Sequence, residues 1–297
     1  MAKKTAAKTP YTQEAHVIGP RDVEFDWSDV PLHYIPGEPF ATQFWNIMHL
    51  AIPLGEKMMA GCLAEALPYI EDPRLREEAV GFIGQESMHA ASHESYHEHL
   101  AAEGIDIEPV VRNLETLLQV FLGDHQLKGR AKEVWLKERL AFFAAAEHFT
   151  AVVGQWMLEA EAWDEVGMHP MMKDLLRWHG AEEVEHRNVL FDVYQHVDGS
   201  YSRRVRMSVV ASLGLFASWM ITADYLMRQD PTSRWWKPWP VQMLNSVRKR
   251  LLPGPWFFVG ELPSYLRPGF HPSQMGSLDA AIAYLATSPA ARAAEQR

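Results

Sequence analysis

Glutamate and histidine side chains recur at helical spacing in two stretches of this chain, and two isolated glutamates accompany them. In helical bundles that hold two iron or manganese ions, two helices each provide one Glu and two others each provide a Glu-x-x-His pair, all directed inward. This chain contains that set once, complete and in order. The sequence therefore predicts helices packed around a two-metal site. The candidate ligands of this set are Glu56, Glu86, His89, Glu147, Glu183 and His186, and His179 is a further candidate because it lies four positions before Glu183 on the same helical face.

The spacing within the two stretches suits ligands of one site. Each residue of an α-helix advances by about 100°, so side chains three or four positions apart lie on neighbouring turns of one face. Glu86 and His89 are three positions apart, and so are Glu183 and His186. Each pair can supply an imidazole and a bridging carboxylate, and the isolated glutamates can supply the remaining carboxylates.

The alternative interpretation is a set of buried ion pairs without metal. A single Glu-x-x-His on a surface helix is usually a solvated charged face. Here, however, the two isolated glutamates lie among apolar residues, in Pro53-Leu-Gly-Glu56-Lys-Met-Met and Phe142-Phe-Ala-Ala-Ala-Glu147-His-Phe. A carboxylate in such surroundings is costly to bury without a partner or a metal. The pattern therefore favours the metal site.

Other polar residues flank the candidate ligands. His93 shares the helical face of the first pair and would be either an eighth ligand or a hydrogen-bond partner of a ligand, as metal-bound histidines usually have such partners. Glu182 and Glu185 flank the second stretch and are expected to point elsewhere, as ion-pairing or hydrogen-bonding groups. We expect His97 and His148 to be surface or packing histidines.

The donor types narrow the choice of metal. Cys62 is the only cysteine, which excludes an internal disulfide and a cysteine-based zinc or iron–sulfur site, and indicates a reducing compartment. Carboxylates with imidazoles suit iron or manganese better than structural zinc. Two iron ions are the first expectation, with manganese or a mixed manganese and iron pair as alternatives. Such a pair can react with O2 or activate a bound water for hydrolysis.

Helical periodicity extends over most of the chain after residue 38, and strand signals are nearly absent. The expected fold class is therefore all-α. Pro53 and Gly55 would either kink the first helix, which would direct Glu56, or mark the start of that helix. Candidate helices cover residues 41–68, 73–103, 109–126, 130–163, 170–198 and 203–228.

Composition divides the chain into three parts. Residues 1–38 are rich in Pro, Gly and charge, and we expect an extended or disordered segment in which only Asp26 to Tyr34 packs. Residues 39–230 form the helical bundle, with the apolar helix 203–228 packed on it. Residues 231–297 are interrupted by prolines and rich in aromatic side chains, as in Trp235-Trp-Lys-Pro-Trp239, and are expected to wrap the bundle.

Charge is distributed unevenly along the chain. Residues 1–200 carry 33 Asp and Glu against 16 Lys and Arg, whereas residues 201–297 carry 5 against 12. The acidic body argues against a nucleic-acid partner, while the basic part could lie on an anionic membrane surface. The N-terminus lacks the apolar core of a secretory signal. We therefore expect a cytoplasmic protein, or one peripheral to the inner face of the membrane.

The apolar stretch from Met207 to Met227 bears on the membrane question. Its 21 residues are just long enough to span a bilayer, but Asp224 and several hydroxyl side chains dilute it. We expect a helix packed on the bundle. Contact with a membrane surface through residues 201–260 is the alternative, and the tryptophan cluster would otherwise belong to the core or to a homodimer interface.

Several signatures together resemble those of a known family. The chain is similar to the bacterial predicted metal-dependent hydrolases of the ferritin-like superfamily over about residues 22–285. The resemblance implies a ferritin-like four-helix bundle with additional helices and a C-terminal extension. The signatures are Pro53-Leu-Gly-Glu56, Phe82-Ile-Gly-Gln-Glu86-Ser-Met-His89, Glu147-His-Phe-Thr150, Trp178-His-Gly-Ala-Glu-Glu-Val-Glu-His186 and Tyr265-Leu-Arg-Pro-Gly-Phe-His-Pro272.

The order of the candidate ligands also resembles that of p-aminobenzoate N-oxygenase-type di-iron enzymes. This likeness makes His179 a seventh ligand and implies a di-iron centre that uses O2 and an external electron donor to oxidise a small, apolar or aromatic substrate. A dinuclear hydrolase that uses a metal-bridged hydroxide is the second hypothesis. A non-enzymatic iron-handling protein is the third, although the long aromatic extension argues against a ferritin-type cage.

Overall fold

Helices account for all the regular structure in the part of the chain that the computed structural model describes, residues 18–232 and 238–297, and no strand occurs there. The all-α, bundle-type fold predicted from the sequence is confirmed. The elements are α1 (Pro39–Ala66), η1 (Leu67–Tyr69), α2 (Pro73–Glu94), α3 (His97–Ala102), α4 (Glu108–Leu122), α5 (Gly129–Glu159), α6 (Glu161–Glu165), α7 (Pro170–His186), α8 (Val189–Val197), α9 (Tyr201–Gln229), α10 (Trp239–Arg248), α11 (Pro255–Glu261), η2 (Leu262–Leu266), η3 (Pro272–Gln274), α12 (Leu278–Leu285) and α13 (Pro289–Ala294).

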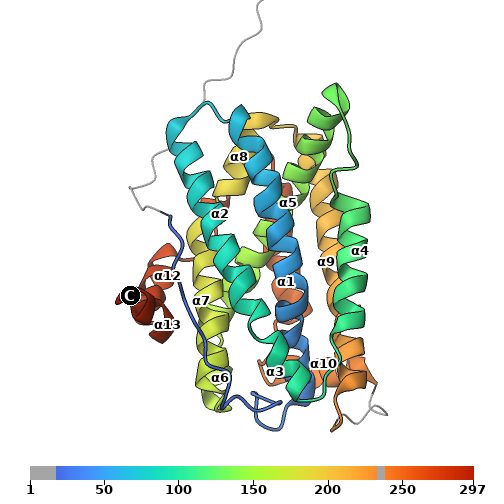
Figure 1. The fold of residues 1–297 in the computed structure, drawn as a ribbon, viewed down its shortest axis with the longest axis vertical. Helices are drawn as coiled ribbons and strands as arrows, with labels where there is room; N and C mark the ends of the chain where they lie inside the picture. Colours follow the sequence, from blue (N-terminus) through green and yellow to red (C-terminus); the bar gives the residue numbers. More distant parts are fainter. Residues whose placement is uncertain (1–17, 233–237) are drawn as a thin grey trace, which may run out of the picture.

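The long helices lie side by side along the longest axis of the molecule (Figure 1). α1 packs mainly against α2, and α5 packs against α7, so that these four helices enclose the bundle interior. α8 lies against α5 and α2. α9 covers α5 and α1 from outside, and α12 covers α7. The seven candidate ligands lie on α1, α2, α5 and α7, the four helices that face this interior.

Three of the predicted helices are interrupted, two of them at a residue whose side chain donates a hydrogen bond to a backbone carbonyl. The predicted 73–103 helix divides into α2 and α3 at Ser95, whose hydroxyl donates to the Ser92 carbonyl. The predicted 170–198 helix divides into α7 and α8 at Arg187, whose guanidinium donates to the Val184 carbonyl. The 130–163 helix divides at Ala160, and the 109–126 helix already ends at Leu122. Local side-chain bonds compete here with helix continuation.

Pro53 lies well inside α1, so the alternative that it marks the helix start is wrong. Proline has no N–H group, and in a helix it leaves the carbonyl four residues earlier without its usual donor. That carbonyl belongs to His49, and His97 Nε2 donates to it over 2.6 Å. His97, from the start of α3, therefore compensates for the proline in α1, which agrees with its expected packing role.

An N-terminal segment, residues 18–38, runs along the outside of α2 and α7 (Figure 1). Two glycines of α2 permit its close approach. A Cβ atom on Gly81 would lie 2.2 Å from the Ile18 carbonyl oxygen, and one on Gly84 would lie 3.0 Å from Pro20. The expected packing stretch is buried at Trp27, Val30 and Tyr34. Residues 1–17 lie outside the described part of the chain.

The C-terminal segment contacts several sides of the bundle. η2 lies against α5 and α9, α10 contacts α1, and both α12 and α13 lie on α7. The expected tryptophan cluster falls largely on residues 233–237, which the structure does not describe.

α9 packs on the bundle with one face only. Trp219 and Leu226 are buried, whereas Leu213, Phe216 and Ile221 are more than half exposed. In the described residues this helix alone is long and apolar enough to cross a membrane, by length and composition, and 22% of its most apolar window is buried in the protein. One face of α9 is therefore packed on the bundle, and the other is exposed.

Candidate metal centre

The bundle brings all seven candidate ligands together in two buried groups. Within each group, one donor atom from every residue lies within 4.8 Å of the others. Glu183 belongs to both groups, which is the position of a carboxylate shared by two ions. The first group is Glu56, His89, His179 and Glu183, and the second is Glu86, Glu147, Glu183 and His186.

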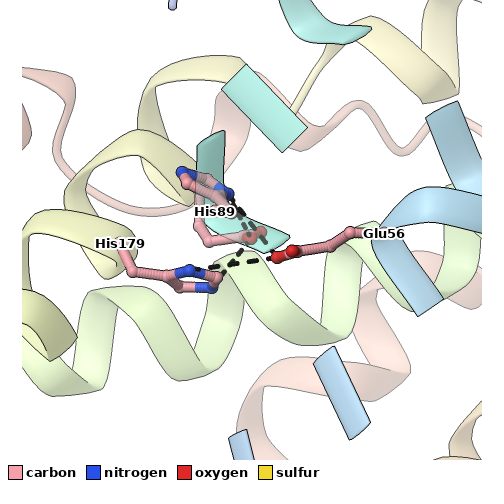
Figure 2. Close-up of side chains that lie close together, drawn as sticks. Glu56, His89 and His179 are labelled. Atoms are coloured by element: carbon pink, nitrogen blue, oxygen red, sulfur yellow. Dashed lines mark ion pairs between the residues drawn. The ribbon is translucent and has the colours of Figure 1, made fainter. Parts of the chain in front are cut away.

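The first group joins α1, α2 and α7. Figure 2 shows the imidazoles of His89 and His179 directed toward the carboxylate of Glu56. His89 Nδ1 lies 3.6 Å from Glu56 Oε1 and 3.8 Å from Glu183 Oε1. His179 Nε2 lies 3.1 Å from Glu183 Oε1. The donor atoms of α1, α2 and α7 therefore converge within this group.

The second group joins α2, α5 and α7. His186 Nε2 lies 3.2 Å from Glu86 Oε1 and equally 3.2 Å from Glu147 Oε1. Its distance to Glu183 Oε2 is 3.8 Å. The two oxygens of Glu183 therefore face different groups, Oε1 toward the first and Oε2 toward the second.

The buried polar atoms that have no hydrogen-bond partner show whether the centre suits metal ions. Buried polar atoms in proteins almost always have a partner. Here the buried atoms without a hydrogen-bond partner include both carboxylate oxygens of Glu56, Glu86 and Glu147, together with Glu183 Oε2. The imidazole atoms His89 Nδ1, His179 Nε2 and His186 Nε2 also lack one. Within the seven candidate ligands, the atoms without a partner are thus those of the two donor groups, as metal coordination requires.

The charges of the centre lead to the same conclusion. Burial, reinforced by neighbouring carboxylates, raises the pKa of Glu56 and of Glu86 well above the usual range for glutamate. Burial likewise raises the pKa of Glu147 to about 7. Several carboxylates in one dry volume disfavour their own ionisation. Cations bound between them would remove that cost.

Two of the histidines are oriented by partners outside the centre. His89 Nε2 lies 3.0 Å from Glu182 Oε2. Because a carboxylate only accepts, this nitrogen carries the proton, and the lone pair of Nδ1 faces the first group. His186 Nδ1 lies 3.0 Å from Gln85 Oε1, which leaves Nε2 for the second group. Such outer hydrogen bonds are typical of metal-binding histidines.

Arg21, in the N-terminal segment, connects the partner of His89, Glu182, with the partner of His186, Gln85, through Glu185. Its guanidinium donates to Glu182 Oε1 over 2.7 Å and to both oxygens of Glu185 over 2.9 Å. Glu185 in turn accepts from Gln85 Nε2 over 2.7 Å. The expectation that Glu182 and Glu185 form ion pairs beside the centre agrees with this geometry. No spacing rule pointed to Arg21 or Gln85, because both are distant in sequence from the residues that they support.

Arg21→Met should weaken metal binding although Arg21 contacts no candidate ligand. The variant removes the cation that fixes Glu182 and Glu185, so the partners of both histidines are held less firmly, and metal affinity should fall by about 10–100-fold. Metal titration of the purified variant measures this. Arg139→Met is the matched control, because Arg139 makes a similar two-bond pair with Glu65 outside both groups. Equal metal affinity in the two variants would contradict the role assigned to Arg21.

His93 lies next to the first group but outside it. Its Nε2 is 3.1 Å from His179 Nδ1, and its Nδ1 is 3.0 Å from His49 Nδ1. With both nitrogens engaged, the hydrogen-bonding role fits His93 better than the role of an eighth ligand. His148 is buried, 4% exposed, and stacks on Tyr265, outside both groups.

A small pocket opens beside His179, between α1, α5 and α9. Its volume is about 10 Å³, close to what one water molecule needs. Apart from His179 and Thr150, the lining is apolar. The apolar lining residues are Met48, Ile52, Phe149, Val153, Met157 and Trp219.

The bundle and its two donor groups define a helical protein with buried groups of the metal-binding type. Comparison with models of known protein families identifies its family. The chain belongs to the family described as predicted metal-dependent hydrolases, whose model matches residues 19–276. This match confirms the resemblance to the predicted metal-dependent hydrolases. No curated protein and no solved structure matches the chain significantly.

Proposed function

We propose that the chain is a di-iron enzyme that uses O2 to oxidise a small apolar or aromatic compound. The seven candidate ligands would hold two iron ions, one in each donor group, with Glu183 between them. Donor chemistry supports iron or manganese, because every donor atom is a carboxylate oxygen or an imidazole nitrogen.

The pocket beside His179 is the observation that favours O2 chemistry over hydrolysis. It adjoins the first donor group, and its volume of about 10 Å³ accommodates a molecule of the size of O2 or water. An apolar lining favours O2 and an apolar substrate over the charged substrates of many hydrolases. The flexible side chains of Met48 and Met157 line the same pocket, and their movement would admit a larger substrate.

The residues of the chain would serve this reaction in distinct ways. Bound iron would supply the electron transfer to O2. The bundle core would exclude water, and Trp219 of α9, whose indole donates to the Phe44 carbonyl over 3.1 Å, would cover the pocket. In a balanced monooxygenation one oxygen atom enters the substrate, and the other takes up two electrons and two protons and leaves as water. An external donor, a reduced redox protein or a reduced flavin, would supply the two electrons.

A dinuclear hydrolase is the second candidate, and the description of the family favours it. Two ions held by the same residues would activate a water for attack on an ester or amide. This function would need neither O2 nor an electron donor, and it would tolerate manganese or zinc.

Anaerobic loading with Fe(II), followed by addition of O2, distinguishes the two functions. We expect O2 uptake in proportion to bound iron and a change in visible absorption, since Fe(II) held in pairs is oxidised. Protein loaded with zinc is the control for uptake that does not depend on iron. Stable Fe(II) in air, together with cleavage of p-nitrophenyl esters by the zinc or manganese form without O2, would overturn the oxygenase proposal in favour of the hydrolase.

A further inference from the structure

α9 has an outer side on which a row of apolar residues stays exposed. Arg206 and Arg228, both exposed, bracket this row. The two arginines and the row fall within about 140° around the helix axis, and hence on one side of α9. The one acidic residue between the two arginines, Asp224, pairs with Arg228 over 2.7 Å. The apolar row, called the α9 face, consists of Val209, Val210, Leu213, Phe216 and Ile221.

α11 lies beside α9 and adds two more exposed apolar side chains. Trp256 is 82% exposed and Val259 is 61% exposed. Phe258, between them, stacks on Phe149 of α5 at a centroid distance of 5.5 Å. Phe149 and Trp219 of α9 line the same small pocket, so α9 and α11 cover neighbouring parts of one side of the bundle. Exposed apolar side chains on two neighbouring helices are typical of a binding surface, and tryptophan is typical of the boundary between membrane and water.

Basic residues border this apolar surface at both ends. Arg267 lies near the start of α9, because Arg204 of α9 donates to its carbonyl oxygen over 2.6 Å. Arg248, the last residue of α10, lies toward the end of the bundle where α9 finishes (Figure 1). The side chains of Arg248 and Arg267 are exposed, and neither forms an ion pair with another described residue. Together with Arg206, they give the apolar surface a positive border.

Lipid headgroups complement this border better than a second copy of the chain does. In a two-fold dimer each surface meets an identical one. The α9 face would then bring its positive border against the positive border of the other copy, which like-charge repulsion disfavours. An anionic bilayer supplies phosphate groups for the arginines and an apolar layer for the side chains between them.

We propose that the α9 face, together with Trp256 and Val259, docks on the surface of an anionic lipid bilayer. α9 lies along the membrane surface: its apolar row enters the boundary between headgroups and acyl chains, and its arginines bind lipid phosphates. The opposite side of α9 stays packed on the bundle, where the Trp219 indole donates to the Phe44 carbonyl over 3.1 Å. The helix therefore lies on the membrane and does not span it.

This orientation places the small pocket beside His179 on the side of the molecule that faces the lipid. Trp219 of α9 lines that pocket, and so does Phe149, on which Phe258 of α11 stacks. An apolar substrate dissolved in the bilayer would reach the pocket from this side. That last step rests on the proposed function, whereas the docking requires neither metal nor O2, so the two can fail independently.

Sedimentation of the whole chain with sucrose-loaded vesicles tests the docking. At low salt we expect about tenfold or tighter binding to vesicles that contain phosphatidylglycerol than to vesicles of phosphatidylcholine alone, since each arginine near an anionic surface contributes about fivefold. Higher salt should weaken this binding. Leu213→Glu/Phe216→Glu should lower the affinity by about 100-fold, because two apolar side chains lose their burial in the lipid.

Val80→Glu/Ile282→Glu is the matched control. It makes the same exchange, with the same added charge, at two exposed apolar residues of α2 and α12. These helices lie away from α9 (Figure 1), so this variant should keep most of the affinity for vesicles. Circular dichroism should show that both double variants remain helical, since all four substituted side chains are exposed.

A label on single positions identifies which face touches the lipid. Cys62 is buried, so an environment-sensitive fluorophore attached to Leu213→Cys reports on the α9 face. We expect its emission to shift to shorter wavelength when anionic vesicles are added, whereas the same label on Val80→Cys should not shift.

Four results would each overturn the proposal. They are a protein that stays in the supernatant with anionic vesicles at low salt, an equal loss of binding in the control, and a label at position 213 that stays in water while the protein sediments. The fourth is a dimer that Leu213→Glu/Phe216→Glu converts into a monomer, because the α9 face would then be an interface between two copies of the chain.

Discussion

Glu183→Ala should abolish the binding of both metal ions, the largest functional effect that we expect of any single substitution. Glu183 is the one residue that belongs to both donor groups, with a different oxygen facing each. Loss of an outer hydrogen-bonding partner already costs a metal site about 10–100-fold in affinity, and loss of a shared ligand should cost more for both ions. Elemental analysis of the variant after loading and dialysis measures the result.

Glu56→Ala and Glu147→Ala serve as the matched comparison. Each of these glutamates belongs to one group only, so each variant should retain the ion of the other group. Circular dichroism should show that all three variants remain helical, because most helical stability comes from the packed apolar faces. If Glu183→Ala retained two ions per chain, or lost no more than the other two variants, the shared position of this carboxylate would be refuted.

Gly154→Ala should lower the free energy of unfolding by about 2 kcal/mol and weaken metal binding as well. α5 and α7 approach each other closely at Gly154 and Gly180. A Cβ atom on Gly154 would lie 2.7 Å from the Gly180 carbonyl oxygen and 3.1 Å from Cβ of Glu183. The added methyl group would therefore separate two ligand-bearing helices and displace the shared ligand. Denaturant unfolding and metal titration measure the two effects.

Gly214→Ala is the control for the intrinsic preference of helices for alanine. Gly214 lies in α9, where a Cβ atom would meet nothing within 4 Å. This variant should gain about 0.5–1 kcal/mol, since alanine is the better helix former. If Gly154→Ala were stabilised to the same extent, the close approach of α5 and α7 would not constrain the metal centre.

Local pattern was sufficient for much of the fold and for the set of candidate ligands. Helical periodicity identified the long helices, and the three-residue spacing of Glu86 and His89 placed both on one face, because helix geometry is fixed by the backbone. Boundaries were less predictable. At the breaks after α2 and α7, the side chains of Ser95 and Arg187 donate hydrogen bonds to nearby backbone carbonyls. Arg187 also donates to the carbonyl of Pro272, which is distant in sequence.

The sequence by itself determined which side chains could bind metal, since the spacing of donors along a helix is a local property. Only the tertiary structure decided how they are shared and supported. It placed Glu183 between the two groups, brought Arg21 of the N-terminal segment to Glu182 and Glu185, and left one face of α9 exposed. These features depend on which helix faces meet, and packing between residues far apart in the chain sets that.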